Sequence, residues 1–170
     1  MYEVGTTVIY RSEGVCEITD IIVKSFKDKD IEYYVLKPVY KENSEIFVPK
    51  NNTELVRKMK RIMTKDEIYH LINDMPNEES IWISNENERK EKYKEIIFNG
   101  NRTELVQLIK TLYIHKQNQR SEGKKLHLAD ERFLKDAERI LYDEFAYVLD
   151  ITPDKVVPFI MGEIEGSVNA

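Results

Sequence analysis

The chain has one cysteine, one tryptophan and no long apolar run. Cys16 has no second cysteine to pair with, which excludes an internal disulfide and a zinc site built on a cysteine cluster. No stretch approaches the roughly 20 apolar residues of a membrane-spanning helix, and the first residues lack the basic and apolar regions of a signal peptide. We therefore expect a cytoplasmic protein in which Cys16 is an ordinary core thiol.

Motifs for catalysis are also missing. The sequence contains no Gly-rich phosphate loop, no nucleophile elbow and no paired carboxylates that stand out from the charged background. The three histidines lack metal-ligand spacing, so surface or boundary positions are expected for His70, His115 and His127. We therefore predict no enzymatic activity, no catalytic residue, no metal site and no cofactor.

Positive charge is scarce over the chain as a whole but not everywhere along it. The net charge of -5 argues against a protein that coats nucleic acid indiscriminately. Residues 82–135 nevertheless carry 12 Lys or Arg against 8 Asp or Glu, whereas residues 136–170 carry 2 against 8. A phosphate-facing surface is therefore possible only in the first segment, and an ordinary solvated mixture of charges is the alternative.

The sequence does contain a clear change of period. Two-residue alternation, which is typical of strands, runs to Pro49, and helical spacing follows from Thr64. Four or five short strands fit a strongly bent sheet or a small open barrel, and a parity conflict near Asp20 predicts a β-bulge. The fold class is therefore α+β, with a β-domain over residues 1–58, a helical domain over residues 59–165 and a flexible tail over residues 166–170.

Caps and turns mark the expected helices. Thr64 and Glu67 have the spacing of a capping box, and Met75 and Pro76 follow the helix that it begins. The cationic residues 57–61 are interpreted as the seam between the domains, where four cations could contact phosphate or keep a linker hydrated. About five helices are predicted: 65–74, 87–98, one from 103 to a polar insertion at 117–125, one from there through 145, and a short one after 152.

Trp82 lies between helices and not on an apolar helical stripe. Lysines and an arginine follow it on the next helix. A large flat side chain beside cations could press against base edges or a sugar while the cations bind phosphate. The alternative is that Ile81, Trp82 and Ile83 fill a gap between helices. Local sequence leaves both interpretations open.

The β-domain offers a second kind of surface, because the unpaired backbone groups of an edge strand can accept a strand of another protein. Lys24 and Phe47 lie near such strands. The ordinary alternative is a solvated lysine and a core phenylalanine.

A series of motifs runs through both halves of the chain. The β-half contains Val4-Gly5, TVIY, Gly14, YYVLK and Val48-Pro49. The helical half contains the loop tryptophan, a basic helix, the Asn-Gly-Asn turn at 99–101, ELVQLIKTLY and LADERFLKDAERIL. In the order and spacing of these motifs, nearly the whole chain resembles the CarD/CdnL family of bacterial transcription regulators. The β-domain is also similar to the polymerase-binding module of transcription-repair coupling factor.

The resemblance implies that a Tudor-like β-domain docks on the RNA polymerase β subunit by edge-strand pairing. It also implies that the helical domain contacts promoter DNA at the upstream edge of the melted region. The tryptophan of this family wedges into the minor groove, and Trp82 matches its position. The resemblance assigns DNA contact to Trp82, Arg89, Lys90, Lys92, Lys94 and Arg132, and polymerase contact to Lys24, Tyr33, Lys37 and Phe47.

Departures from the family pattern lower the expected affinity for DNA. The insertion SNENE delays the first cation after the tryptophan, Phe47 stands where a basic contact is common, and Asp130 and Glu131 dilute the charge near Arg132. We therefore expect weak DNA binding without polymerase, and no membrane or small-molecule partner. The expected function is a non-enzymatic regulator, nucleoid-associated through polymerase, that stabilises the promoter open complex. The alternative is a protein–protein adaptor of the transcription machinery without direct DNA contact.

Overall fold

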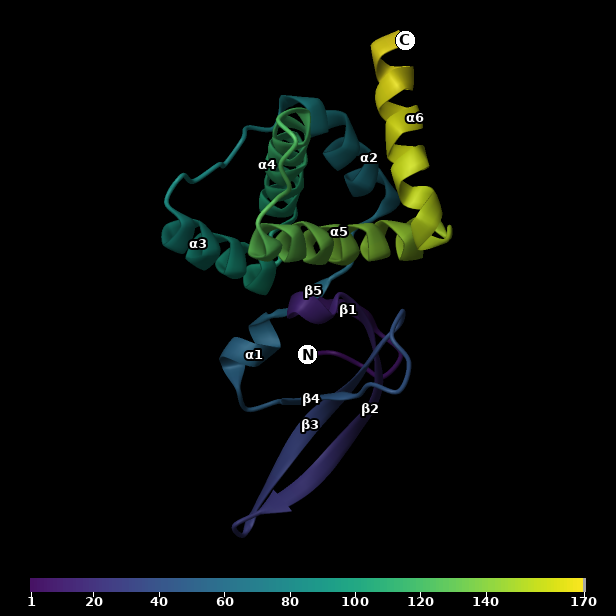
Figure 1. Cartoon of the computed structure of the whole chain (residues 1–170). Coiled ribbons are helices and arrows are strands. Elements are labelled where there is room, and N and C mark those ends of the chain that lie inside the picture. The colour runs from purple at the N-terminus through teal and green to yellow at the C-terminus, as the bar shows by residue number, and fades with distance from the viewer. Residues whose placement is uncertain (170) are drawn as a thin grey trace. The chain divides into compact units, whose positions relative to one another are not determined.

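The computed structural model describes residues 1–169, with side chains as far as Gly166. The chain divides into two compact units, one comprising Met1–Ile62 and one that begins at Met63. The first unit contains a β-sheet and the second is helical, so the predicted α+β class is confirmed (Figure 1).

The sheet unit is built on five antiparallel strands in the order β4-β3-β2-β1-β5. A long β2–β3 hairpin is its most extended part (Figure 1). The hairpin turn, Lys27-Asp28, has positive φ at both residues, as a type I′ turn requires. The elements are β1 (Thr7–Tyr10), β2 (Val15–Phe26), β3 (Lys29–Pro38), β4 (Ile46–Pro49), α1 (Thr53–Arg57) and β5 (Met59–Arg61).

The predicted bulge in β2 is confirmed. The register between β2 and β3 shifts between Ile18 and Asp20, which leaves Thr19 as the extra residue. The shift places Ile18 and Ile21 on the same side of the sheet, against a core that includes Cys16, Tyr34, Leu36 and Val48. The bulge therefore resolves the parity conflict, and it turns the side chains of Ile22 and Lys24 to the opposite face.

The interpretation of residues 57–61 as a linker is wrong. Met59–Arg61 form strand β5, which pairs with β1, and Met59 is buried in the sheet core. A single apolar residue within a cationic run gave no alternating pattern from which a strand could be predicted. The short helix α1 was also not predicted; the side chain of Asn52 caps it by accepting from the N–H of Leu55.

The capping box of the helical unit is confirmed. Thr64 Oγ1 accepts from the N–H of Glu67 at 3.2 Å, and the Glu67 carboxylate accepts from the N–H of Thr64. The Asn-Gly-Asn turn joins two helices: Gly100 is left-handed with φ 67°, and Asn101 caps the next helix. The helices are α2 (Lys65–Asp74), α3 (Glu86–Asn99), α4 (Arg102–Ser121), α5 (Leu128–Leu149) and α6 (Val156–Asn169).

Two helices are longer than predicted. Helix α4 continues to Ser121, through most of the polar insertion, and α6 continues to Asn169, where a tail from Gly166 was expected; Ala170 lies outside the described residues. Exposed polar residues are compatible with a helix, and a single glycine costs a helix only about 1 kcal/mol relative to alanine. Neither feature is therefore sufficient to end a helix.

Helix α5 contacts the other four helices of its unit. One apolar cluster joins α5 to α3 and α4, and a second joins it to α2 and α6. Glu144, buried in α5, accepts from Arg102 of α4 at 2.9 and 2.7 Å and from the N–H of Met63 at 2.8 Å. None of the described helices combines the length and the apolar character that crossing a bilayer requires.

Candidate polymerase and nucleic-acid interfaces

Four sequence-predicted residues share the outer face of the sheet unit. The ammonium of Lys24 lies 4.1 Å from the centre of the Phe47 ring and 5.8 Å from that of Tyr33. Lys37 lines the same shallow hollow of about 460 Å³ as Lys24 and Phe47. Phe47 is 41% exposed, so the alternative of a core phenylalanine is wrong. The structure thus forms one surface that combines two lysines with the exposed ring of Phe47 and the half-buried ring of Tyr33.

The strand next to this surface is an end strand of the sheet. β4 pairs with β3, with Phe47 opposite Val35, and no strand within the described part of the chain pairs with its other side. Its outer backbone groups can therefore accept a strand from a partner. Pro49 has no N–H, so it cannot donate a hydrogen bond at that end of the strand.

In the helical unit, the loop that carries Trp82 is fixed by side chains of two helices. The N–H of Ile81 donates to Thr111 Oγ1 of α4 at 2.8 Å, and the hydroxyl of Tyr93 in α3 donates to the carbonyl of Ile81 at 3.1 Å. Burial, with the charge of Asp130, raises the pKa of Tyr93 to about 12, which keeps this hydroxyl protonated. The backbone beside the indole is therefore held from both sides, although it has no regular secondary structure.

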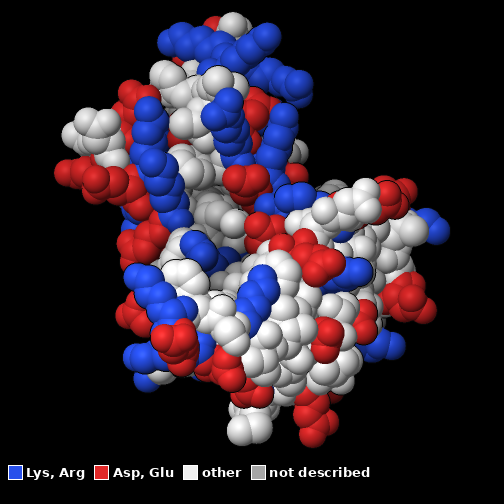
Figure 2. Space-filling view, turned by 90° about the horizontal axis from the view of Figure 1, so that it is seen from below, with Lys and Arg blue, Asp and Glu red and all other residues white. Residues whose placement is uncertain are grey.

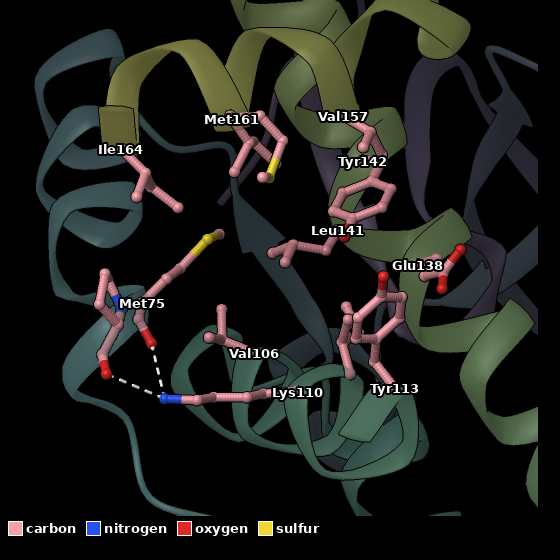
Figure 3. A pocket seen from close by; sticks show the side chains of 13 residues that line it. Met75, Val106, Lys110, Tyr113, Glu138, Leu141, Tyr142, Val157, Met161 and Ile164 are labelled. Carbon is pink, nitrogen blue, oxygen red and sulfur yellow. Dashed lines mark hydrogen bonds between the residues drawn. The ribbon is translucent and has the colours of Figure 1, made fainter. Parts of the chain in front are cut away.

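Lys110 holds the beginning of the same loop. Its ammonium donates to the carbonyls of Met75, Pro76 and Glu78 at 3.2, 3.0 and 2.8 Å, and Figure 3 shows the first two bonds. An ammonium has three N–H groups, so all of them are used. Lys110 also lines a largely apolar hollow of about 510 Å³ within the helical unit (Figure 3). Lys110 therefore has no free N–H with which to bind a phosphate in this hollow.

Arg89 holds the end of the loop. Its guanidinium forms two bonds with the Asp130 carboxylate of α5, at 3.0 and 3.1 Å, and donates to the carbonyls of Ile83 and Ser84 at 3.0 and 3.4 Å. Arg89 is 3% exposed and Asp130 is fully buried. The expectation that Arg89 contacts DNA phosphate therefore does not fit its position. Asp130 neutralises this arginine in the interior and does not dilute surface charge.

Trp82 itself remains at the surface, with 36% of its area exposed. Its ring stacks on His115 of α4, with 3.8 Å between the ring centres and 21° between the planes, and the Arg89 guanidinium lies 4.5 Å from the ring centre. Its neighbours Ile81 and Ile83 pack against the apolar cluster of α3, α4 and α5. The two isoleucines therefore fill the gap between helices, whereas the indole between them is presented to solvent.

The remaining predicted cations have mixed surroundings. Lys90 forms a salt bridge with Glu86 at 3.1 Å, and Lys92 lies 3.8 Å from Glu104. On the face shown in Figure 2, basic and acidic side chains are intermixed, without a broad area of either sign. Lys94 and Arg132 are exposed, and neither forms a salt bridge with another described residue.

Comparison with known families gives a match for each half of the chain. Residues 2–60 match the family model of the CarD-like/TRCF RID domain, and residues 67–161 match that of the CarD C-terminal domain. The chain belongs to the CarD family. No curated protein sequence matches it significantly.

The two CarD domains indicate a transcription regulator that interacts with RNA polymerase, and such regulators are non-enzymatic. The sheet unit is the Tudor-like CarD domain, as the sequence resemblance implied. Among the described residues, no group of three or more His, Cys, Asp or Glu side chains is arranged to hold a metal ion.

The sequence did not reveal three residues that shape the tryptophan site of this CarD chain: Thr111, His115 and Asp130. Each is distant in sequence from the loop, which Thr111 and His115 contact directly and Asp130 supports through Arg89, so no local pattern connects them. One signal was available, because Thr111 is a polar residue beside the apolar stripe of Leu105, Leu108 and Leu112. A polar side chain at a helix core boundary needs a hydrogen-bond partner, which here is the loop.

Proposed function

We propose that this CarD-family chain binds the RNA polymerase β subunit with its sheet unit and stabilises the promoter open complex. In this proposal the helical unit contacts DNA at the upstream edge of the melted region. The observation that carries it is Trp82, an indole with 36% of its area exposed, on a loop whose backbone is bonded to α3 and α4. A side chain that is already ordered loses little conformational entropy when it contacts DNA.

The energetic role follows from linkage. A protein that contacts opened DNA but not the closed duplex shifts the equilibrium between the closed and open complexes toward the open one. The shift equals the difference between its affinities for the two complexes, about 1.4 kcal/mol for each tenfold. An apolar wedge can supply that difference, because its contacts form only where a base step is unstacked or bent.

Docking on polymerase compensates for a weak electrostatic attraction between the helical unit and DNA. Arg89 is buried, and Lys90 and Lys92 lie beside carboxylates, so few free cations remain for phosphate. Attachment through the sheet unit raises the effective concentration of the indole at the promoter. The support for docking at the β subunit is the family resemblance, together with the exposed surface of Lys24 and Phe47 beside the open edge of β4.

The wedge is tested with a fork-junction promoter DNA and RNA polymerase holoenzyme. The lifetime of the polymerase–DNA complex is measured without the protein, with the protein and with Trp82→Ala. We expect the protein to lengthen the lifetime and Trp82→Ala to abolish most of the gain. Tyr113→Ala is the matched control, since Tyr113 is another exposed aromatic residue of the helical unit, and it should leave the gain unchanged.

Docking is tested separately by retention on immobilised β subunit. Lys24→Glu should reduce retention at least tenfold, because it places a carboxylate against the Phe47 ring and reverses the charge at position 24. Lys65→Glu, an exposed site on α2, should retain the protein like the wild type. Equal retention of both variants would mean that the docking surface lies elsewhere.

A protein–protein adaptor without DNA contact is the second candidate. The carboxylates beside Lys90 and Lys92 in the helical unit favour it. Under this hypothesis Lys24→Glu still abolishes retention, whereas Trp82→Ala leaves the lifetime of the fork-junction complex at the wild-type value. The two measurements together thus distinguish the candidates.

A further inference from the structure

The orientation of the Trp82 ring is determined by residues outside its own loop. His115 provides a near-parallel imidazole at 3.8 Å, and Arg89 provides a guanidinium at 4.5 Å from the ring centre. Backbone bonds alone would fix the position of the loop but would leave the two side-chain torsions of the indole free to change. The stack with a ring on a different element restricts these torsions.

Both supporting groups are themselves anchored. His115 lies in the long helix α4, and its Nε2 is 3.1 Å from the amide nitrogen of Gln119, one helical turn further on. A neutral ring can accept a hydrogen bond from that amide. Arg89 is fixed by Asp130, as described above. The indole therefore rests on groups that belong to the rigid part of the unit.

The surroundings of His115 favour its neutral form. Burial lowers its pKa below the ordinary value of 6.5, the neighbouring Arg89 and His127 lower it further, and Asp130 and Glu122 act in the opposite direction. Asp130 already accepts two hydrogen bonds from Arg89, which limits how far its carboxylate can stabilise a positive charge on His115. The pKa of His115 therefore lies below its ordinary value, which favours the neutral ring near pH 7.

We propose that His115 is a positioning residue for Trp82: the neutral imidazole stacks on the indole and holds it in the orientation that contacts DNA. The inference deepens the proposed function and rests on it for the DNA contact. Removal of the imidazole leaves the loop in place but gives the indole more than one orientation. Another aromatic ring at position 115 preserves the orientation, because stacking does not require an imidazole.

The stack can be measured without DNA, because Trp82 is the only tryptophan of the chain. Indole emission is quenched more strongly by a protonated imidazole than by a neutral one. We expect the emission of the full-length protein to fall with a midpoint below pH 6.5 as the pH is lowered. The titration should persist in His70→Ala and His127→Gln and be absent in His115→Phe. A midpoint that persists in His115→Phe would overturn the inference.

The consequence for DNA is measured as the lifetime of the fork-junction complex at pH 7.5. His115→Ala should reduce the gain in lifetime by about two- to tenfold, the range expected for loss of one aromatic pair, and His115→Phe should restore it. His70→Ala controls for removal of an exposed histidine in the same unit. Retention on the β subunit should be unchanged in all three variants.

The outcomes separate this inference from the proposed function. If Trp82→Ala abolishes the gain but His115→Ala does not, the positioning role is wrong and the wedge survives. If Trp82→Ala has no effect, the wedge is wrong, and the DNA role of His115 falls with it; the emission titration then still decides whether the stack exists. If His115→Phe does not restore the gain lost in His115→Ala, a purely structural role replaces positioning.

Discussion

At the scale of single residues, the most consequential interaction is the buried pair of Arg89 and Asp130. Two hydrogen bonds connect their side chains, and the same guanidinium supports the Trp82 loop. A buried pair gains little over an apolar pair of the same size, but the loss of one partner leaves an uncompensated charge in the interior. The pair therefore makes the site sensitive to substitutions that do not touch its exposed surface.

Asp130→Asn is expected to lower the free energy of unfolding by about 3–5 kcal/mol, since it leaves the Arg89 guanidinium buried without a counter-charge. Urea unfolding followed by circular dichroism measures the change. Lys90→Gln, which removes the exposed salt bridge with Glu86 on the same helix, is the control and should change stability little. The double variant Arg89→Met with Asp130→Leu should be more stable than Asp130→Asn; if it is not, the loss has another cause than the unpaired charge.

Cys16 should be unreactive in the folded protein. Burial, with a smaller effect of the Glu13 charge, raises the pKa of its thiol to about 12. At pH 8 only about one thiol in ten thousand is then ionised, and the thiolate is the reactive form. Labelling by iodoacetamide should be slow in buffer and fast in urea. Rapid labelling in buffer would show that this part of the sheet opens without global unfolding.

At the scale of elements, caps determine where the helices of this chain begin. The capping box at Thr64 satisfies two N–H groups at the start of α2, and Asn85 and Asn101 each satisfy one at α3 and α4. Helix α5 has no side-chain cap at His127. Its position instead depends on buried contacts, above all Asp130 in its first turn.

Thr64→Ala should reduce the free energy of unfolding by about 1 kcal/mol, because it removes the acceptor for the N–H of Glu67. The comparison is Thr103→Ala, which changes an exposed threonine inside the first turn of α4 where Asn101 is the cap. Both variants are measured by thermal and urea unfolding. A larger loss for Thr103→Ala than for Thr64→Ala would contradict the assigned role of the box.

At the scale of the whole molecule, the chain consists of two units with separate interiors. The core of the sheet unit is formed by residues from β1 to β5 and α1, and the helical unit contains its own two apolar clusters. Each unit can therefore be expected to fold around its own core, as the proposed division into a polymerase-binding unit and a DNA-contacting unit requires.

A fragment of residues 1–62 should fold by itself. Its amide nuclear magnetic resonance spectrum should be dispersed and should overlay on the corresponding peaks of the full chain. A fragment of residues 1–58, which ends before β5, is the matched comparison and should be destabilised, because it loses Met59 from the core and the partner of β1. If the two fragments have equal stability, β5 is dispensable and the shorter boundary predicted from the sequence is the functional one.

Local signals in the sequence were sufficient for much of the fold. The change of period predicted the α+β class, the spacing of Thr64 and Glu67 predicted the start of α2, and the parity conflict predicted the bulge in β2. The sequence failed at β5, where one buried methionine provides the only apolar signal. It also failed to predict the length of α4, because polar residues on an exposed helix resemble a loop.

The sequence by itself determined most of the elements and the position of Trp82 in a loop, because periodicity, caps and turns act over a few neighbouring residues. That the indole is exposed came from the tertiary structure. Only the tertiary structure decided the roles of Arg89, His115 and Asp130, which come from three helices. The sequence around an arginine looks the same in two cases: when it pairs with a carboxylate 41 residues away, and when it is exposed and binds a phosphate of a partner. Which of these it meets depends on how the helices pack, and that depends on the sum of many distant contacts.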